Sequence, residues 1–154
     1  MHHHALEITR KLGWEAISAQ NYSHLGAVRI AKENYQRAVE PYRNALEIYQ
    51  RLGKTEHIAE NCKSLGLLHA AMSNFDPAVK LLRKSVAAFE TVGNQEAVAF
   101  QTGNLGIVYE QRGELERAVE TLERAVELFR EVGTERSTEV YETTLAQLRE
   151  KMTG

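Results

Sequence analysis

The chain has 154 residues, of which 43% are apolar and 26% are charged, and its formal net charge is -2. This apolar fraction excludes a disordered chain, and no run approaches the roughly 20 consecutive apolar residues of a membrane-spanning helix. The 19 basic residues are fewer than the 21 acidic ones, so no excess positive charge is available to attract phosphates. We therefore expect neither a nucleic acid nor a membrane as a partner.

The N-terminus and the cysteine content indicate the cellular setting. We interpret residues 1–4 as the remnant of an expression tag, with a metal-binding histidine run as the alternative. The single cysteine, Cys62, excludes an internal disulfide. No apolar secretion signal follows the first residues, so the expected location is the cytoplasm. We expect residues 5–154 to form one array.

Small and aromatic residues recur every forty positions. Two rows consist of glycine: Gly13, Gly53, Gly93 and Gly133, and then Gly26, Gly66 and Gly106, each of the latter preceded by leucine (Leu25, Leu65, Leu105). Three further rows are Ala38, Ala78 and Ala118; Ala45, Ser85 and Ala125; and Tyr49, Phe89 and Phe129. A fixed period of this length is the signature of a repeat architecture.

The segments between the glycines have helical periodicity. Apolar residues step by three or four positions, and no segment alternates with period two, which disfavours a propeller built from strands. We expect first helices at 15–31, 55–71, 95–111 and 135–151, and second helices at 35–51, 75–91 and 115–131. Residues 5–13, ALEITRKLG, resemble ALEIYQRLG at 45–53, which predicts the tail of a preceding second helix.

The rows divide the array into units. We expect a preceding tail at 5–13, whole repeats at 14–53, 54–93 and 94–133, and, at 134–152, the first helix of a fourth repeat or a capping helix. Half repeats at both ends suggest head-to-tail self-association, in which the last helix of one molecule stacks on the first fragment of another.

The residues that interrupt the pattern predict where helices end. The glycines of the row that contains Gly13 and Gly53 are expected to adopt the left-handed conformation and so to end the second helices. Asn34, Asn74 and Gly113 mark the turn inside each pair. Pro41 requires either a late helix start or a kink. The inner glycines at 26, 66 and 106 indicate close helix approach, with the alanine row at 38, 78 and 118 as the matching small residues.

The recurring motif aromatic-x-x-Leu-Gly, followed by Ala-x-x-x-aromatic or leucine and then alanine, resembles the tetratricopeptide repeat family. The period of forty resembles the long-helix variety of kinesin light chains and Pins-type adaptors. Tyr22 keeps the first aromatic, whereas Cys62 and Thr102 replace it in later repeats. The resemblance implies an all-α solenoid, a right-handed superhelix of helix-turn-helix repeats with about seven full helices plus an N-terminal helical fragment. HEAT-like helical repeats are the alternative.

In such repeats the first helices line a concave groove that takes peptides or partner helices. The resemblance therefore places the candidate binding residues on that side: Gln20, Ser23, His24, Ala27, Glu60, Lys63, Ser64, Leu67, Phe100, Asn104, Ile107 and Gln111. Leu25, Leu65 and Leu105 are expected to face the core.

Three short rows on the first helices, two of them made of these candidates, differ in what they imply. Asn104 matches the asparagine that bonds a peptide backbone in kinesin-light-chain-type repeats, whereas His24 and Ser64, at the equivalent positions, are expected to be structural or solvated. The row Ala27, Leu67 and Ile107 would hold a partner's side chains or pack between first helices. The amide row Asn21, Asn61 and Gln101 is expected to bond between neighbouring helices.

No catalytic or cofactor site is expected. Cys62 occupies a core position, where a thiol behaves as a small hydrophobe. His57 and His69 are about 18 Å apart along one helix and cannot share a metal ion. The leading hypothesis is a protein-protein interaction module that binds a peptide or helical segment as part of a larger scaffold or regulatory protein. The alternative is a structural array that self-associates through its open ends.

Overall fold

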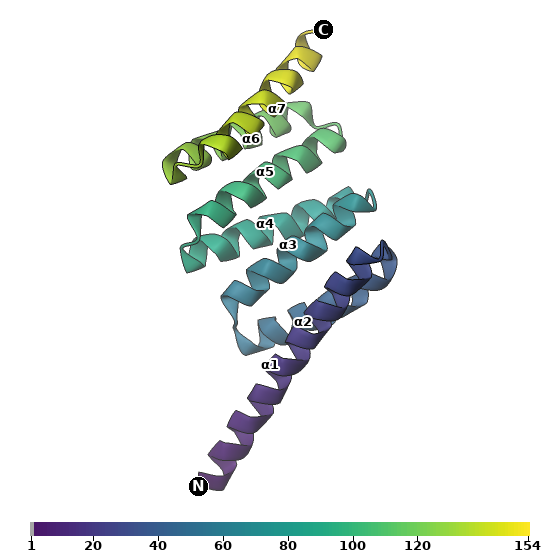
Figure 1. Cartoon of the computed structure of the whole chain (residues 1–154), viewed down its shortest axis with the longest axis vertical. Helices are drawn as coiled ribbons and strands as arrows, with labels where there is room; N and C mark the ends of the chain where they lie inside the picture. The colour runs from purple at the N-terminus through teal and green to yellow at the C-terminus, as the bar shows by residue number, and fades with distance from the viewer. Residues whose placement is uncertain (1) are drawn as a thin grey trace.

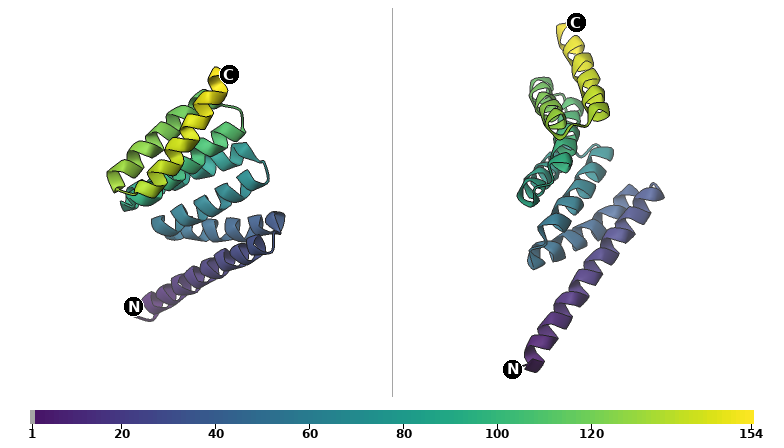
Figure 2. Two further views of the ribbon diagram at one scale, coloured as in Figure 1. Left: turned by 45° about the horizontal axis from the view of Figure 1, so that its top comes forward. Right: turned by 60° about the vertical axis from the view of Figure 1, so that its left-hand side comes forward.

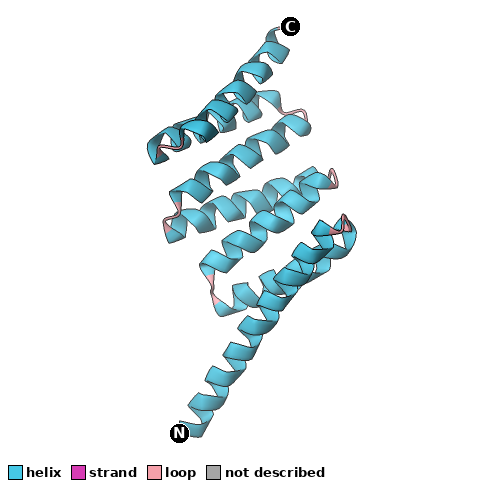
Figure 3. Ribbon diagram, viewed as in Figure 1, coloured by secondary structure: helices cyan, strands magenta, loops and turns pink. Residues whose placement is uncertain are grey.

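The computed structural model describes residues 2–154 as a stack of helices, without strands in that range (Figures 1 and 3). The loops between helices are short, as expected for antiparallel neighbours. The helices are α1 (His2–Ala31), α2 (Tyr35–Leu52), α3 (Thr55–Ala71), α4 (Phe75–Val92), α5 (Gln95–Gln111), α6 (Leu115–Val132) and α7 (Glu135–Thr153). Apart from the start of α1, every helix lies within two residues of its predicted bounds, so the all-α solenoid is confirmed.

The helices follow one another along one axis. Each packs on its chain neighbours, and the first helices α1, α3, α5 and α7 lie along one side of the stack (Figures 1 and 2). The predicted core rows are buried: the alanines at 38, 78 and 118 are fully enclosed, and the aromatics Tyr49, Phe89 and Phe129 are at most 3% exposed. These alanine and aromatic rows are therefore buried seams of the array.

The outer glycines end the second helices as predicted, with one exception. Gly53, Gly93 and Gly133 have φ values of 68°, 76° and 85°, and each ends a helix. Only glycine adopts this left-handed conformation without steric cost. Gly13, in contrast, lies inside α1, which runs without interruption from His2 to Ala31. The prediction that Gly13 ends a helix is wrong, and residues 5–13 extend the first helix instead of folding beside it.

The turns inside the helix pairs centre on the residues at 33, 73 and 113. Glu33 and Ser73 have positive φ values of 58° and 61°, in register with Gly113 at 87°. The sequence assigned Asn34 and Asn74 to these turns. Each directly follows the residue with positive φ and precedes a second helix, α2 or α4. The left-handed residue of the turn is thus glycine in only one of three repeats.

The inner glycines allow close helix approach, and the atoms nearest to them belong to large side chains of the second helices and not to the predicted alanines. A Cβ atom on Gly26 would lie 2.6 Å from the ring of Tyr42, and one on Gly106 would lie 2.8 Å from Leu122. At Gly66 the nearest atom belongs to Leu82, at 3.0 Å. A large side chain of the second helix therefore fills the space that each glycine leaves.

Pro41 lies inside α2, which begins at Tyr35, so the helix does not start late. A proline nitrogen carries no hydrogen, and the carbonyl four residues earlier loses its helical partner. That carbonyl belongs to Arg37, and the Arg29 guanidinium of α1 donates a hydrogen bond to it at 2.7 Å. The side chain of the preceding helix thus satisfies the group that the proline leaves without a donor.

Leu25 departs from its row. Leu65 and Leu105 are 3% and 9% exposed, in agreement with the expected core position, whereas Leu25 is 40% exposed. Leu65 packs in a cluster with Tyr42 and Leu46 of α2, the second helix that precedes it. No second helix precedes α1 in the described residues, so the expectation that Leu25 faces the core is wrong.

Candidate functional site

Neighbouring first helices contact one another directly. The Ser23 hydroxyl of α1 donates to Asn61 Oδ1 of α3 at 2.8 Å, and the Asn61 amide donates in turn to the His57 carbonyl. Asn61 is only 5% exposed. The prediction that the amide row bonds between neighbouring helices is therefore confirmed at Asn61, and Ser23 is part of that contact.

The last neighbouring pair, α5 and α7, uses an aromatic contact at the equivalent place. A Cβ atom on Gly103 would lie 2.5 Å from the Tyr141 ring, which shows how closely the ring covers that glycine. The ring also stacks on Phe129 at a centroid distance of 5.1 Å. Tyr141 occupies the amide row in the fourth repeat, and it closes the first-helix side between α5 and α7.

Between α3 and α5 the first-helix side is hollowed. A cleft of about 320 Å³ lies there, which we name the α3–α5 cleft. Its lining residues are Glu60, Lys63, Phe89, Asn94, Glu96, Ala97, Phe100, Gln101 and Asn104. The structure thus brings together four of the twelve predicted binding residues, namely Glu60, Lys63, Phe100 and Asn104.

Polar groups in the α3–α5 cleft are held in pairs. Lys63 Nζ lies 2.6 Å from Glu60 Oε2, one turn apart on α3. On α5 the Asn104 amide donates to Gln101 Oε1 at 3.0 Å. An asparagine side chain offers two N–H groups and an acceptor oxygen, so Asn104 retains groups that match the N–H and C=O of a peptide bond. The hydrogen bond of Gln101 lies within its own helix, so the expected hydrogen bond to a neighbouring helix is wrong for this residue.

Phe100 supplies the apolar part of the cleft. Its ring is 37% exposed and meets the ring of Phe129 edge to face, with centroids 4.9 Å apart. A partly exposed aromatic ring fixed by a second ring provides contact area with little loss of side-chain entropy. This end of the cleft can therefore hold an apolar side chain of a partner.

The other predicted binding residues lie outside the α3–α5 cleft. Leu67 is 38% exposed, whereas Ile107 is half-buried and packs against the main core. Ser64 is half-buried beside Tyr42, whose pKa is raised by burial and lowered in part by a hydrogen bond with Ser64. The remaining candidates are exposed at other places on the first helices: Gln20, His24, Ala27 and Gln111.

Sequence reasoning missed the N-terminal turn of α5. Asn94 precedes the helix, and its side-chain oxygen accepts from the Ala97 amide at 3.1 Å, while Glu96 lies in the first turn. An asparagine followed by an acidic residue at a helix start is a recognisable capping signal. That signal could have marked this helix boundary, but only the packing of α5 beside α3 shows that the boundary lines the cleft.

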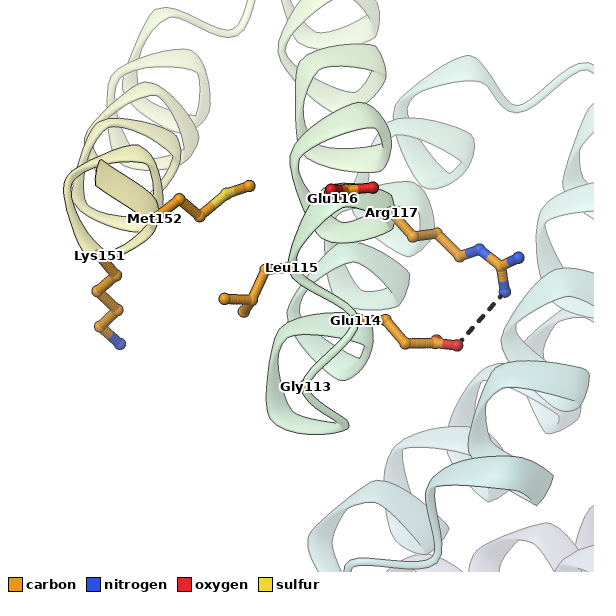
Figure 4. Close-up of a pocket in the computed structure, with 7 residues that line it drawn as sticks. All are labelled: Gly113, Glu114, Leu115, Glu116, Arg117, Lys151 and Met152. Atoms are coloured by element: carbon orange, nitrogen blue, oxygen red, sulfur yellow. Dashed lines mark ion pairs between the residues drawn. The ribbon is translucent and has the colours of Figure 1, made fainter. Parts of the chain in front are cut away.

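A second cleft, of about 610 Å³, lies between the start of α6 and the end of α7 (Figure 4). Glu114 lies 3.7 Å from Arg117 within it, and Lys151 pairs with Glu110 at 3.4 Å. Its remaining lining residues are Gly113, Leu115, Glu116 and Met152. The acidic and basic groups neutralise one another, and no predicted binding residue lines this cleft.

Catalytic groups are not assembled around either cleft. Burial raises the pKa of the Cys62 thiol, with Lys84 acting in the opposite direction, so the reactive thiolate is scarce. His57 stacks on Tyr49 with centroids 4.6 Å apart. Among the described residues, no three histidine, cysteine or acidic side chains are grouped as metal ligands, and no helix is long and apolar enough to span a bilayer.

Comparison with known families identifies the repeat. Two models described as tetratricopeptide repeat match residues 15–91 and 102–133. The chain belongs to the tetratricopeptide repeat family. The family match begins at Glu15 and therefore covers the helix pairs from the first repeat onward. No curated protein matches the sequence of the chain.

Solved structures share the fold at low sequence identity. Aspartyl phosphate phosphatase F from Bacillus subtilis superposes with a TM-score of 0.81 and 14% identity, covering 90% of this chain and 37% of that protein. The apo form of RapI superposes with a TM-score of 0.80 and 16% identity, covering 88% of this chain and 50% of RapI. The N-terminal domain of stress-induced protein-1 from C. elegans superposes with a TM-score of 0.71 and 15% identity, covering 88% of this chain and 97% of that domain. The chain thus spans about a third of the phosphatase and half of RapI.

Proposed function

We propose that this chain is a non-catalytic interaction module that binds a peptide or helical segment in the α3–α5 cleft. The observation that carries the proposal is the combination in one cleft of an exposed aromatic ring, Phe100, with the amide of Asn104. Tetratricopeptide repeats bind protein partners in general, and the family match supports the same role here. The module would serve a scaffold or regulatory protein in the cytoplasm.

The chemistry of the cleft defines the partner. Asn104 would bond a peptide backbone, while Phe100 would bury an apolar side chain next to it. The Lys63 and Glu60 side chains, 2.6 Å apart, would exchange their mutual contact for charged groups of the partner at the rim. We expect a segment with an apolar residue flanked by polar ones, and no nucleic acid.

A phage-displayed library of random twelve-residue peptides tests this proposal. Peptides selected on the wild-type chain should bind Asn104→Ala and Phe100→Ala variants at least ~10-fold more weakly, since a central contact contributes more than about 1 kcal/mol. Val140→Glu is the matched control, because Val140 is exposed on α7 outside the cleft. Selected peptides that bind both cleft variants with wild-type affinity, at unchanged helicity, would overturn the proposal.

A further inference from the structure

The outer face of α1 carries a row of exposed apolar side chains. Its members are Leu6 (63% exposed), Trp14 (64%), Ile17 (51%), Leu25 (40%) and Val28 (49%). Steps of eight and three residues turn by about 80° in one direction and 60° in the other, so these side chains lie within a sector of about 100° along one side of the helix, which we name the α1 stripe. It extends over about 33 Å at 1.5 Å per residue.

The α1 stripe points away from the rest of the molecule. Ala19 and Gly26, which lie roughly opposite the stripe on the helical wheel, pack against Tyr49 and Tyr42 of α2. Figure 1 shows α1 at the end of the stack, with its first half extending beyond α2. Exposed apolar rows of this length indicate an interaction surface.

The repeat register shows what kind of surface covers such a row. One period later Leu25 and Val28 correspond to Leu65 and Leu68, which are 3% exposed and packed against α2. The covering surface is therefore the apolar face of an antiparallel helix. The first half of α1 carries such a face as well, because residues 5–12 resemble residues 45–52 of α2.

The α1 stripe is complementary to itself when one helix is reversed. On the same side of α1, Arg10 lies between Leu6 and Trp14 of the stripe, and Asn21 lies between Ile17 and Leu25. The spacing of these six residues is the same from either end, and Val28 lies beyond this symmetric part. A second antiparallel copy, with its two-fold axis beside residues 15 and 16, would set Leu6 against Leu25, Trp14 against Ile17 and Arg10 against Asn21.

Charge decides between the two possible directions. In a parallel pair Arg10 would face Arg10 and Glu7 would face Glu7, and like charges repel. In the antiparallel pair Arg10 faces the amide of Asn21, and Glu7 faces His24. We propose that the α1 stripe is an interface with a second copy of this chain, which binds antiparallel and head to head as a closed, isologous dimer.

The opposite end of the stack supports this choice over head-to-tail stacking. At the positions where α5 carries Ala99, Gly106 and Tyr109, α7 carries Glu139, Ala146 and Arg149, all of them exposed. The α1 stripe would therefore find no apolar face on α7. The proposal does not depend on peptide binding, since the α3–α5 cleft involves neither α1 nor its stripe.

Sedimentation equilibrium of the intact 154-residue chain tests the proposal. Between about 1 μM and 1 mM, a range that includes weak protein contacts, the average mass should rise toward twice the 17.4 kDa of one chain. EDTA in the buffer prevents the N-terminal histidines from joining copies through a metal. Emission from Trp14, the single tryptophan, should shift to shorter wavelength over the same range. A chain that stays monomeric to about 1 mM would overturn the proposal.

Variants then test the interface and its direction. Trp14→Glu and Leu25→Glu should each raise the dimer dissociation constant at least ~10-fold, whereas Val140→Glu, on the exposed surface of α7, should leave it unchanged. Leu6→Glu should weaken the dimer, and the added change Leu25→Lys should restore it by forming two ion pairs. Circular dichroism monitors the fold of each variant. A dimer that Val140→Glu disrupts, or that the double change fails to restore, contradicts the antiparallel interface.

Discussion

The two ends of this tetratricopeptide array differ in how they meet solvent. At the C-terminal end, α7 buries Tyr141, Leu145 and Leu148 against the stack and exposes mostly polar residues outward. At the N-terminal end, α1 exposes the five apolar residues of its stripe. Terminal repeats need a polar outer face for solubility. The comparison shows that a period repeated in sequence does not give equivalent surfaces, because burial depends on the neighbour that each helix has.

The largest expected effect contrasts two leucines of the same row. Leu65→Ala should lower the free energy of unfolding by about 2–4 kcal/mol, because it leaves a cavity among packed side chains. Leu25→Ala should cost less than about 1 kcal/mol, since much of that side chain is already hydrated. Urea unfolding at low protein concentration measures both. Equal losses would show that Leu25 is covered in solution and would remove the difference between the ends.

A second contrast uses two glycines of the same row and predicts opposite signs. Gly13 is helical with open space around its Cβ position, so Gly13→Ala should stabilise the chain by about 0.5–1 kcal/mol. Gly133 has a φ of 85°, and Gly133→Ala should destabilise by about 1 kcal/mol. Thermal unfolding followed by circular dichroism gives both values. Destabilisation by Gly13→Ala would indicate that the chain turns at Gly13.

The smallest expected effect concerns Arg29 and Pro41. Arg29→Ala should destabilise by about 1 kcal/mol, because the Arg37 carbonyl loses its donor. In a Pro41→Ala background that carbonyl can accept the regular helical bond, so the same change should cost less. A double-mutant cycle measures the difference as a coupling of about 0.5–1 kcal/mol. Zero coupling would show that Arg29 does not compensate for the proline.

The sequence was sufficient to predict the helices because the inner glycine row and the alanine row are buried seams with fixed spacing. It was insufficient at Gly13, although residues 5–13 and 45–53 are closely similar. Gly53 turns the chain so that α2 packs on α3, whereas residues 5–12 have no equivalent packing, and the helix simply continues. Most helical stability in proteins comes from tertiary packing, so similar local sequences can differ in this way.

The candidate site was predictable only in part for a related reason. The rows placed Glu60, Lys63, Phe100 and Asn104 on the first helices, and these four line the α3–α5 cleft. The rows could not show that the cleft is closed one repeat later. Tyr141 replaces the amide of its row, and its ring covers Gly103. A single large residue in the next repeat thus limits the groove, and periodicity carries no information about such exceptions.

The uneven division of the apolar core has a consequence for how the array comes apart. One large cluster joins side chains from α3 to α7, whereas Ala19, Ala45 and Tyr49 form a separate small cluster where α1 meets α2. In a linear array each helix is held only by its neighbours. Thermal fraying should therefore start with α1 peeling from α2 and reach the α4–α6 region last.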